Sequence, residues 1–280
     1  MESEGLRQFL KTVGDAVYLL NTICVGLDGV SKGLVTKSDS LTISWKSSDP
    51  MRTAMSARKF AVRSALIFVN EALLNYIEFL ADCSLQDPNI VRACNSDGAT
   101  EKIKQLSKQV NGQEIYWLPF VILLIRWRNK VVHNSSSKLS PLFKKILTEN
   151  SNIIKKRHAG INVYETIQNF AEQKITLKDF STMIAVTIKF VRFLDKTLYP
   201  SISNPEVFIS RIIDRKLVSI YKRIIGVNGL NKQKSKFKSF LSSTFPSIGE
   251  GEFDTLFKNR FILVKEIDKR IHEQSEKSKK

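Results

Sequence analysis

Apolar residues recur at intervals of three and four over most of this 280-residue chain, which is the spacing of one face of an α-helix. The clearest stretches are residues 4–26, 50–81, 114–133 and 177–198. Asp49-Pro50 and Thr176 stand where the N-terminal caps of two of these helices are expected. Only Leu41–Trp45 alternates in the manner of a short strand or hairpin arm. The pattern predicts an all-α protein.

Shorter helical patterns lie between these stretches and after them. They predict helices at residues 99–110, from Ser140-Pro141 onward, and at 162–173, 204–225 and 250–275. The polar stretch 150–160 is expected to be a basic loop. Pro200 is expected to end the helix 177–198, and the packing pattern weakens after it. We therefore expect a helical bundle over residues 1–200 and an additional basic helical region over residues 201–280.

The chain is strongly basic, with 44 Lys and Arg against 27 Asp and Glu and a net charge of +17. Residues 201–280 alone hold 17 basic and 9 acidic residues, a net charge of +8. Such an excess favours polyanionic partners, nucleic acid first and anionic membrane second. The alternative is that the lysines only solvate the surface.

Several cellular contexts are disfavoured by the sequence. The longest apolar run, Trp117–Ile125, falls short of the roughly 20 residues that a membrane span needs. The acidic N-terminus lacks the basic and apolar regions of a signal peptide. Cys24, Cys83 and Cys94 have neither disulfide-framework nor zinc-site spacing. We expect a cytoplasmic protein with no membrane partner, no metal and no cofactor.

The helix 114–133 changes character towards its C-terminal end. Its apolar run Phe120–Ile125 is followed by the polar residues Arg126, Arg128, Asn129, Lys130 and His133. A guanidinium stabilises phosphate charge and an imidazole transfers protons near neutral pH, so the cluster indicates a phosphate-cleaving site. On a regular helix Asn129 and His133 share a face with Arg126, whereas Arg128 lies about 140° from His133. Arg128 is therefore expected to reach His133 only from a frayed helix end or from a partner chain.

The segment Arg128-Asn129-Lys130-Val131-Val132-His133 resembles the motif of the HEPN family, which is Arg, a polar residue that is often Asn, three to five further positions and His. The resemblance implies a bundle of four to five helices and metal-independent RNA cleavage by the 2′-hydroxyl, leaving a 2′,3′-cyclic phosphate and a 5′-hydroxyl. It also implies a homodimer in which two motifs form one composite site. Many HEPN proteins are toxins or antiviral-defence effectors, so an antitoxin or a regulatory partner protein is a further expectation.

The family pattern selects Arg128, Asn129 and His133 as catalytic, and the shared helix face adds Arg126 as a second phosphate contact. Further contacts to the RNA backbone are expected from Lys130, Lys155, Lys156, Arg157, Lys232, Lys234, Lys236 and Lys238. Glu71 and Glu78, on the helix 50–81, are candidates to orient Arg128 or His133. His158 and His272 lie among charged residues and are expected to be solvated.

Three alternatives remain open from the sequence. The chain can be a non-catalytic helical module that binds RNA or DNA through its basic C-terminal third. It can be a protein-interaction scaffold that uses the apolar helix 114–133 as a dimer interface. Arg126, Arg128 and His133 can also be a solvated helix end, in which His133 is a favourable cation near the negative end of the helix dipole.

Overall fold

The computed structural model describes residues 2–83, 87–133, 137–199, 204–245 and 250–277, and every regular element in these ranges is an α-helix. The all-α prediction is confirmed. The strand expected at Leu41–Trp45 is wrong: this segment is irregular, and Leu41 and Ile43 are about half exposed, with no strand beside them in the described ranges to pair with. The first nine helices are α1 (Glu4–Ser31), α2 (Pro50–Ala81), α3 (Pro88–Cys94), α4 (Ala99–Lys108), α5 (Trp117–His133), α6 (Pro141–Glu149), α7 (Ser151–Arg157), α8 (Val163–Ala171) and α9 (Leu177–Leu198).

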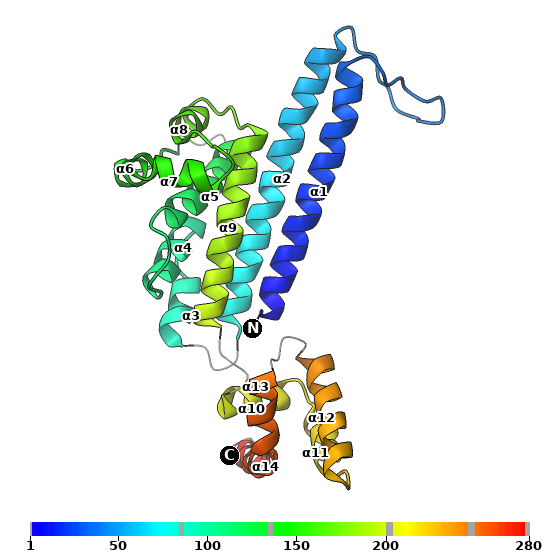
Figure 1. Ribbon diagram of the computed structural model, residues 1–280, viewed down its shortest axis with the longest axis vertical. Coiled ribbons are helices and arrows are strands. Elements are labelled where there is room, and N and C mark those ends of the chain that lie inside the picture. The colour runs from blue at the N-terminus through cyan, green and yellow to red at the C-terminus, as the bar shows by residue number, and fades with distance from the viewer. Residues whose placement is uncertain (1, 84–86, 134–136, 200–203, 246–249, 278–280) are drawn as a thin grey trace.

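The two longest helices, α1 and α2, form a hairpin that lies along one side of the bundle next to α9 (Figure 1). The N-cap carboxylate of Asp49 accepts a hydrogen bond from the Arg52 N–H at 2.9 Å, and Pro50 occupies the first turn of α2. The half of the hairpin nearest its connecting loop exposes large apolar side chains, each between 66% and 75% exposed: Tyr18, Val25, Met51 and Phe60.

By length and composition alone, α1 and α2 are each apolar enough to cross a membrane. In the most apolar 18-residue stretch of each helix, 50% is buried inside the protein in α2 and 11% in α1. Polar residues interrupt the apolar stretches of both helices, so a search for uninterrupted apolar runs does not detect them as candidate spans.

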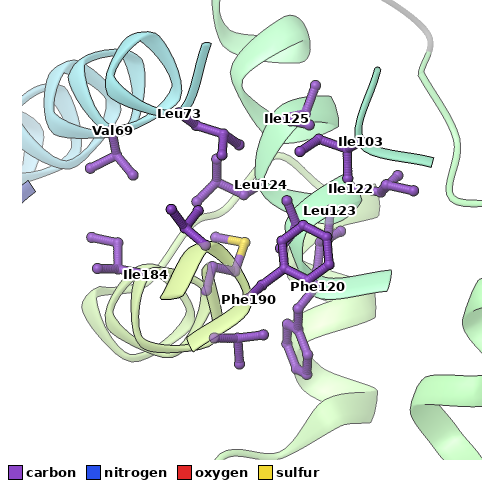
Figure 2. Packing of buried hydrophobic residues seen from close by; sticks show 14 of the residues in the cluster. Val69, Leu73, Ile103, Phe120, Ile122, Leu123, Leu124, Ile125, Ile184 and Phe190 are labelled. Carbon is purple, nitrogen blue, oxygen red and sulfur yellow. The ribbon is translucent and has the colours of Figure 1, made fainter. Parts of the chain in front are cut away.

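The core of the bundle is built around α5. The apolar run Phe120–Ile125 is at most 1% exposed, because α5 packs against α9, α2 and α4. Figure 2 shows these side chains meeting residues from the three surrounding helices, namely Val69, Leu73, Ile103, Ile184 and Phe190. The helix that bears the Arg/His motif is therefore fixed in place along most of its length. The run has no surface left for an interface with another chain.

Two short helices, α3 and α7, form outside the helices that the sequence pattern predicts. α3 follows its N-cap residue Asp87, whose carboxylate accepts a hydrogen bond from the Asn89 N–H. A basic loop was predicted at 150–160, but residues 151–157 form α7. Its residue Ile154 is fully buried, and α6 and α8 pack against the helix. Helices this short are stabilised mainly by tertiary packing, which a local pattern does not reveal.

The remaining helices are α10 (Pro205–Asp214), α11 (Val218–Ile225), α12 (Leu230–Thr244), α13 (Glu250–Lys258) and α14 (Arg260–Lys277). They surround a second hydrophobic core whose members run from Phe208 to Ile267, whereas those of the first run from Leu6 to Leu198. The helices predicted at 204–225 and 250–275 are each interrupted; the first breaks at Lys216, which has a left-handed φ of 55°. Pro200, predicted to end the preceding helix, lies outside the described residues.

The second unit lies beyond the end of the bundle at which α9 terminates (Figure 1). Recorded contacts between the two units include an ion pair of 3.1 Å between Arg215 and Glu4. Arg211 donates a hydrogen bond to the hydroxyl of Tyr199, and its guanidinium lies 4.6 Å from the centre of that ring.

Candidate functional site

The candidate site lies at the C-terminal end of α5, where the core helix reaches the surface. Trp127 is fully buried and meets the ring of Phe170 edge-on, with 5.4 Å between ring centres. This contact anchors the last turns of α5, so that Arg128 and Asn129 are half-buried while His133 is exposed. The site therefore has a fixed inner side and an open outer side.

Arg128 makes the central contacts of the site. Its Nη2 donates to Glu71 Oε1 at 3.0 Å, and its Nη1 lies 3.1 Å from His133 Nε2 and 3.4 Å from Asn129 Oδ1. The Arg128 side chain is 22% exposed, and its Nε is buried without a hydrogen-bond partner among the described atoms. The three residues predicted as catalytic thus lie together, with one of the two predicted orienting carboxylates.

The contact between Arg128 and His133 has a defined donor and acceptor. A guanidinium has donors and no acceptor, so in this hydrogen bond Nε2 of His133 must accept. Release of Nε2 therefore requires that Arg128 find another acceptor.

Two side chains of α5 that were expected to contact substrate point elsewhere. Arg126, placed on the face of His133 by helix geometry, donates instead to the backbone carbonyl of Lys138. Lys130 is 8% exposed; its Nζ donates to the Phe170 carbonyl at 2.9 Å and lies 4.2 Å from the centre of that ring. Burial lowers the pKa of Lys130. The position of Lys130 fits a structural cation and does not fit the predicted substrate contact.

The basic cluster at residues 155–157 lies on the last turn of α7, away from the contacts of Arg128. Lys155 and Lys156 are exposed, and Arg157 forms an ion pair with Glu114. His158 is only 6% exposed, and its Nε2 is 3.4 Å from the hydroxyl of Tyr116, so the expectation that it is solvated is wrong. Burial, followed by the charges of Lys189 and Arg157, lowers the pKa of His158.

The four lysines of the C-terminal region lie on the outer face of α12. Phe237 and Phe240 of this helix face the second core. The four exposed lysines are Lys232, Lys234, Lys236 and Lys238. Lys234 also forms an ion pair of 3.6 Å with Asp254. These residues form a basic surface that is separate from the Arg128 site.

Sequence reasoning also missed features of the site's surroundings. Glu78, the other candidate to orient the motif, is exposed two turns further along α2 and has no recorded contact with Arg128. A groove beside Lys59 and Arg63 of α2 was not anticipated. The sequence does contain a pattern that could have indicated it. Lys59, Arg63, Ile67 and Glu71 are spaced four residues apart and therefore form one ridge along α2.

No group of three metal-ligating side chains occurs in the part of the chain that the structure describes. The groups at hand are a guanidinium, an amide, an imidazole and a carboxylate, which can bind an anion and move a proton. Comparison with protein-family models, with curated proteins and with solved structures finds no match for this chain.

Proposed function

We propose that the chain is a metal-independent endoribonuclease of the HEPN type, with its site in a HEPN-like helical bundle over residues 1–200. The observation that carries the proposal is the cluster of Arg128, Asn129 and His133 at the end of a buried helix, with Arg128 held by Glu71. These are the residues that the motif selects, and Arg128 contacts both of the others although it leaves the helix about 140° from His133.

The contacts support a simple sequence of events. A phosphate group of RNA is a stronger acceptor for the Arg128 guanidinium than a neutral imidazole, because its hydrogen bonds are charge-assisted. Binding of the phosphate therefore frees Nε2 of His133. That nitrogen removes the proton of the 2′-hydroxyl, the 2′-oxygen attacks the adjacent phosphorus, and Arg128 stabilises the added negative charge. The 5′-oxygen leaves with a proton from an acid, which gives a 2′,3′-cyclic phosphate and a 5′-hydroxyl.

The second proton transfer favours a homodimer with a composite site. One chain supplies one imidazole at the site, since His158 is buried against Tyr116 and His272 lies on α14. His133 of a second copy can act as the acid. The apolar run Phe120–Ile125 cannot form the interface, but exposed apolar side chains lie beside the motif: Val132 is 43% exposed, and Phe68, one turn from Glu71, is 61% exposed. We propose that they pack across a two-fold axis.

The biological setting is proposed on the resemblance alone. The protein acts in the cytoplasm as a toxin or antiviral-defence effector whose activity is restrained by an antitoxin or a regulatory partner. The second candidate function is non-catalytic binding of RNA, which is favoured by the exposed lysines of α12 because they lie apart from the Arg128 site.

The test is cleavage of RNA by the purified protein and by its His133→Ala, Arg128→Ala and His272→Ala variants in the presence of EDTA. His272 is 76% exposed on its side chain and serves as the matched control. We expect cleavage by the parent and by the control, and none by the two site variants. Equal cleavage by all four proteins, or cleavage that needs added magnesium, would refute the proposed chemistry.

A further inference from the structure

A groove runs between α2 and the turn that joins α8 to α9. It holds a volume of about 500 Å³ and is lined by Lys59 and Arg63 of α2 and by residues 172–176 of the turn. The turn is held open by Gln173, whose φ of 58° is left-handed, and by the capping of α9 through Thr176. The shape of the groove is therefore fixed by backbone geometry on one side and by a long helix on the other.

The groove has an excess of positive charge that its own residues do not neutralise. Lys59 and Arg63 are exposed, and neither is engaged in a hydrogen bond or an ion pair in the described ranges. Lys174 is paired with Glu172 at 2.7 Å. Asp179, the first acidic residue after the turn, is only 2% exposed. Its carboxylate accepts hydrogen bonds from Thr166, Asn169 and Thr176, so it does not neutralise the groove. Two cations remain free to meet an anion.

The groove and the Arg128 site are joined by one row of side chains on α2. Lys59, Arg63, Ile67 and Glu71 follow one another at intervals of four residues, and such residues form one ridge that turns about 40° around the helix at each step. From Arg63 to Glu71 the helix rises about 12 Å, at about 1.5 Å per residue. Glu71 is the residue that holds Arg128. An extended anion that reaches Arg128 can therefore continue along α2 into the groove.

We propose that this groove binds the phosphodiester backbone of the single RNA strand on one side of the cleaved bond, an inference that rests on the proposed function. The lining residues include two unpaired cations and no aromatic side chain, so they recognise phosphate charge and not the bases. Binding is accordingly independent of sequence and sensitive to salt. The groove keeps the strand in line with Arg128 and His133 while the exposed side of the site stays open to the second copy.

The experiment uses the full chain with His133→Ala, so that RNA is bound without being cut. Binding of a short single-stranded RNA is measured over a series of salt concentrations, with and without Lys59→Gln and Arg63→Gln. A matched control carries Lys11→Gln and Lys196→Gln, two exposed lysines on α1 and α9. Lys59→Arg with Arg63→Lys keeps the charge and should bind like the parent.

We expect the Gln pair in the groove to weaken binding at low salt by at least 10-fold and to flatten the salt slope by about 1.4, since each lost contact to a single strand contributes about 0.7. The control pair should change binding much less. Equal losses in both pairs, or no loss in the groove pair, would overturn the groove as an RNA site while leaving RNA cleavage by the parent intact. If the parent neither binds nor cuts RNA, the proposed function fails instead.

Inorganic phosphate distinguishes a strand from a free anion. If phosphate alone, at millimolar concentration, raised the melting temperature through Lys59 and Arg63 while RNA binding ignored both residues, the groove would be a site for a small anion and the proposal would be wrong. In the active chain, the groove variant should raise KM and leave kcat near that of the parent. A fall in kcat with unchanged KM would contradict a role in binding.

Discussion

Replacing Glu71 with Ala tests whether the carboxylate positions Arg128. Nη2 of Arg128 donates to Glu71 Oε1. Nη1 is shared between His133 Nε2 and Asn129 Oδ1. Without Glu71, Nη2 loses its acceptor and the guanidinium is free to move. A displacement on the order of 1 Å in a reacting group can lower a rate by about 10²-fold. We therefore expect cleavage at saturating RNA to fall by about 10- to 100-fold.

Glu71→Ala should lower the stability of the fold only slightly, so a loss of cleavage in this variant would come from the position of Arg128 and not from unfolding. The side chains of the pair are 22% and 46% exposed, so solvent screens much of their attraction. Partly exposed pairs contribute about 0.2–1 kcal/mol, which for a chain of this size lowers the melting temperature by no more than about 4 °C. RNA affinity should stay the same or rise, because a negative charge leaves the neighbourhood of the bound phosphate.

The assay is single-turnover cleavage with enzyme in excess, together with RNA binding in the His133→Ala background and thermal melting. Glu78→Ala is the matched control, an exposed carboxylate on the same helix. Glu71→Gln, which keeps an acceptor oxygen but not the charge, should fall between the parent and Glu71→Ala. Cleavage by Glu71→Ala at the parent rate would refute the positioning role. A loss of cleavage that merely follows a large loss of stability would do so as well.

Three further outcomes are expected. Lys130→Met should lower the free energy of unfolding by about 1–3 kcal/mol, because the Phe170 carbonyl loses its charged side-chain donor, yet leave KM for RNA unchanged; a raised KM in the folded variant would restore Lys130 as a substrate contact. The lowered pKa of His158 means that its neutral form stabilises the fold above pH 6.5, and that this contribution is lost as the pH falls through the folded-state pKa. Urea unfolding between pH 7.5 and 5 should therefore show a smaller loss of stability for His158→Gln than for the parent, and parallel losses would contradict the assignment. Substituting Gln for the four lysines of α12 should lower RNA affinity at low salt without changing cleavage at saturating RNA, and an unchanged affinity at every salt concentration would reduce that surface to solvation.

The long helices were predictable because their signals are local. The capping box of Thr176 with Asp179 starts α9 where the sequence places it, and α9 runs over the predicted residues 177–198. α7 was missed because the burial of Ile154 depends on neighbouring helices and not on its own periodicity. The breaks at Lys216 and Asn259 follow from packing around the second core, which a periodic pattern does not specify.

At the candidate site, the motif selects residues from the sequence but does not predict which of their side chains are in contact. The motif selected Arg128 and His133, but helix angles placed their side chains about 140° apart. Those angles describe the direction of the Cα–Cβ bond, whereas a guanidinium at the end of a long side chain reaches around the helix to Nε2. Lys130 shows the opposite case. It lies next to the motif in sequence, and Phe170, 40 residues away, determines that it is buried.

The two hydrophobic cores share no residue, so we expect them to unfold as two cooperative units. The recorded contacts across their junction are polar, such as the exposed pair of Arg215 with Glu4 and the half-buried bond of Arg211 to Tyr199. Units joined in this way can unfold one at a time, and a ligand raises the transition of the unit that it binds. Calorimetry of the intact chain can therefore show where RNA binds. RNA held by the bundle should raise the melting temperature of one unit, and RNA held by the lysines of α12 should raise that of the other.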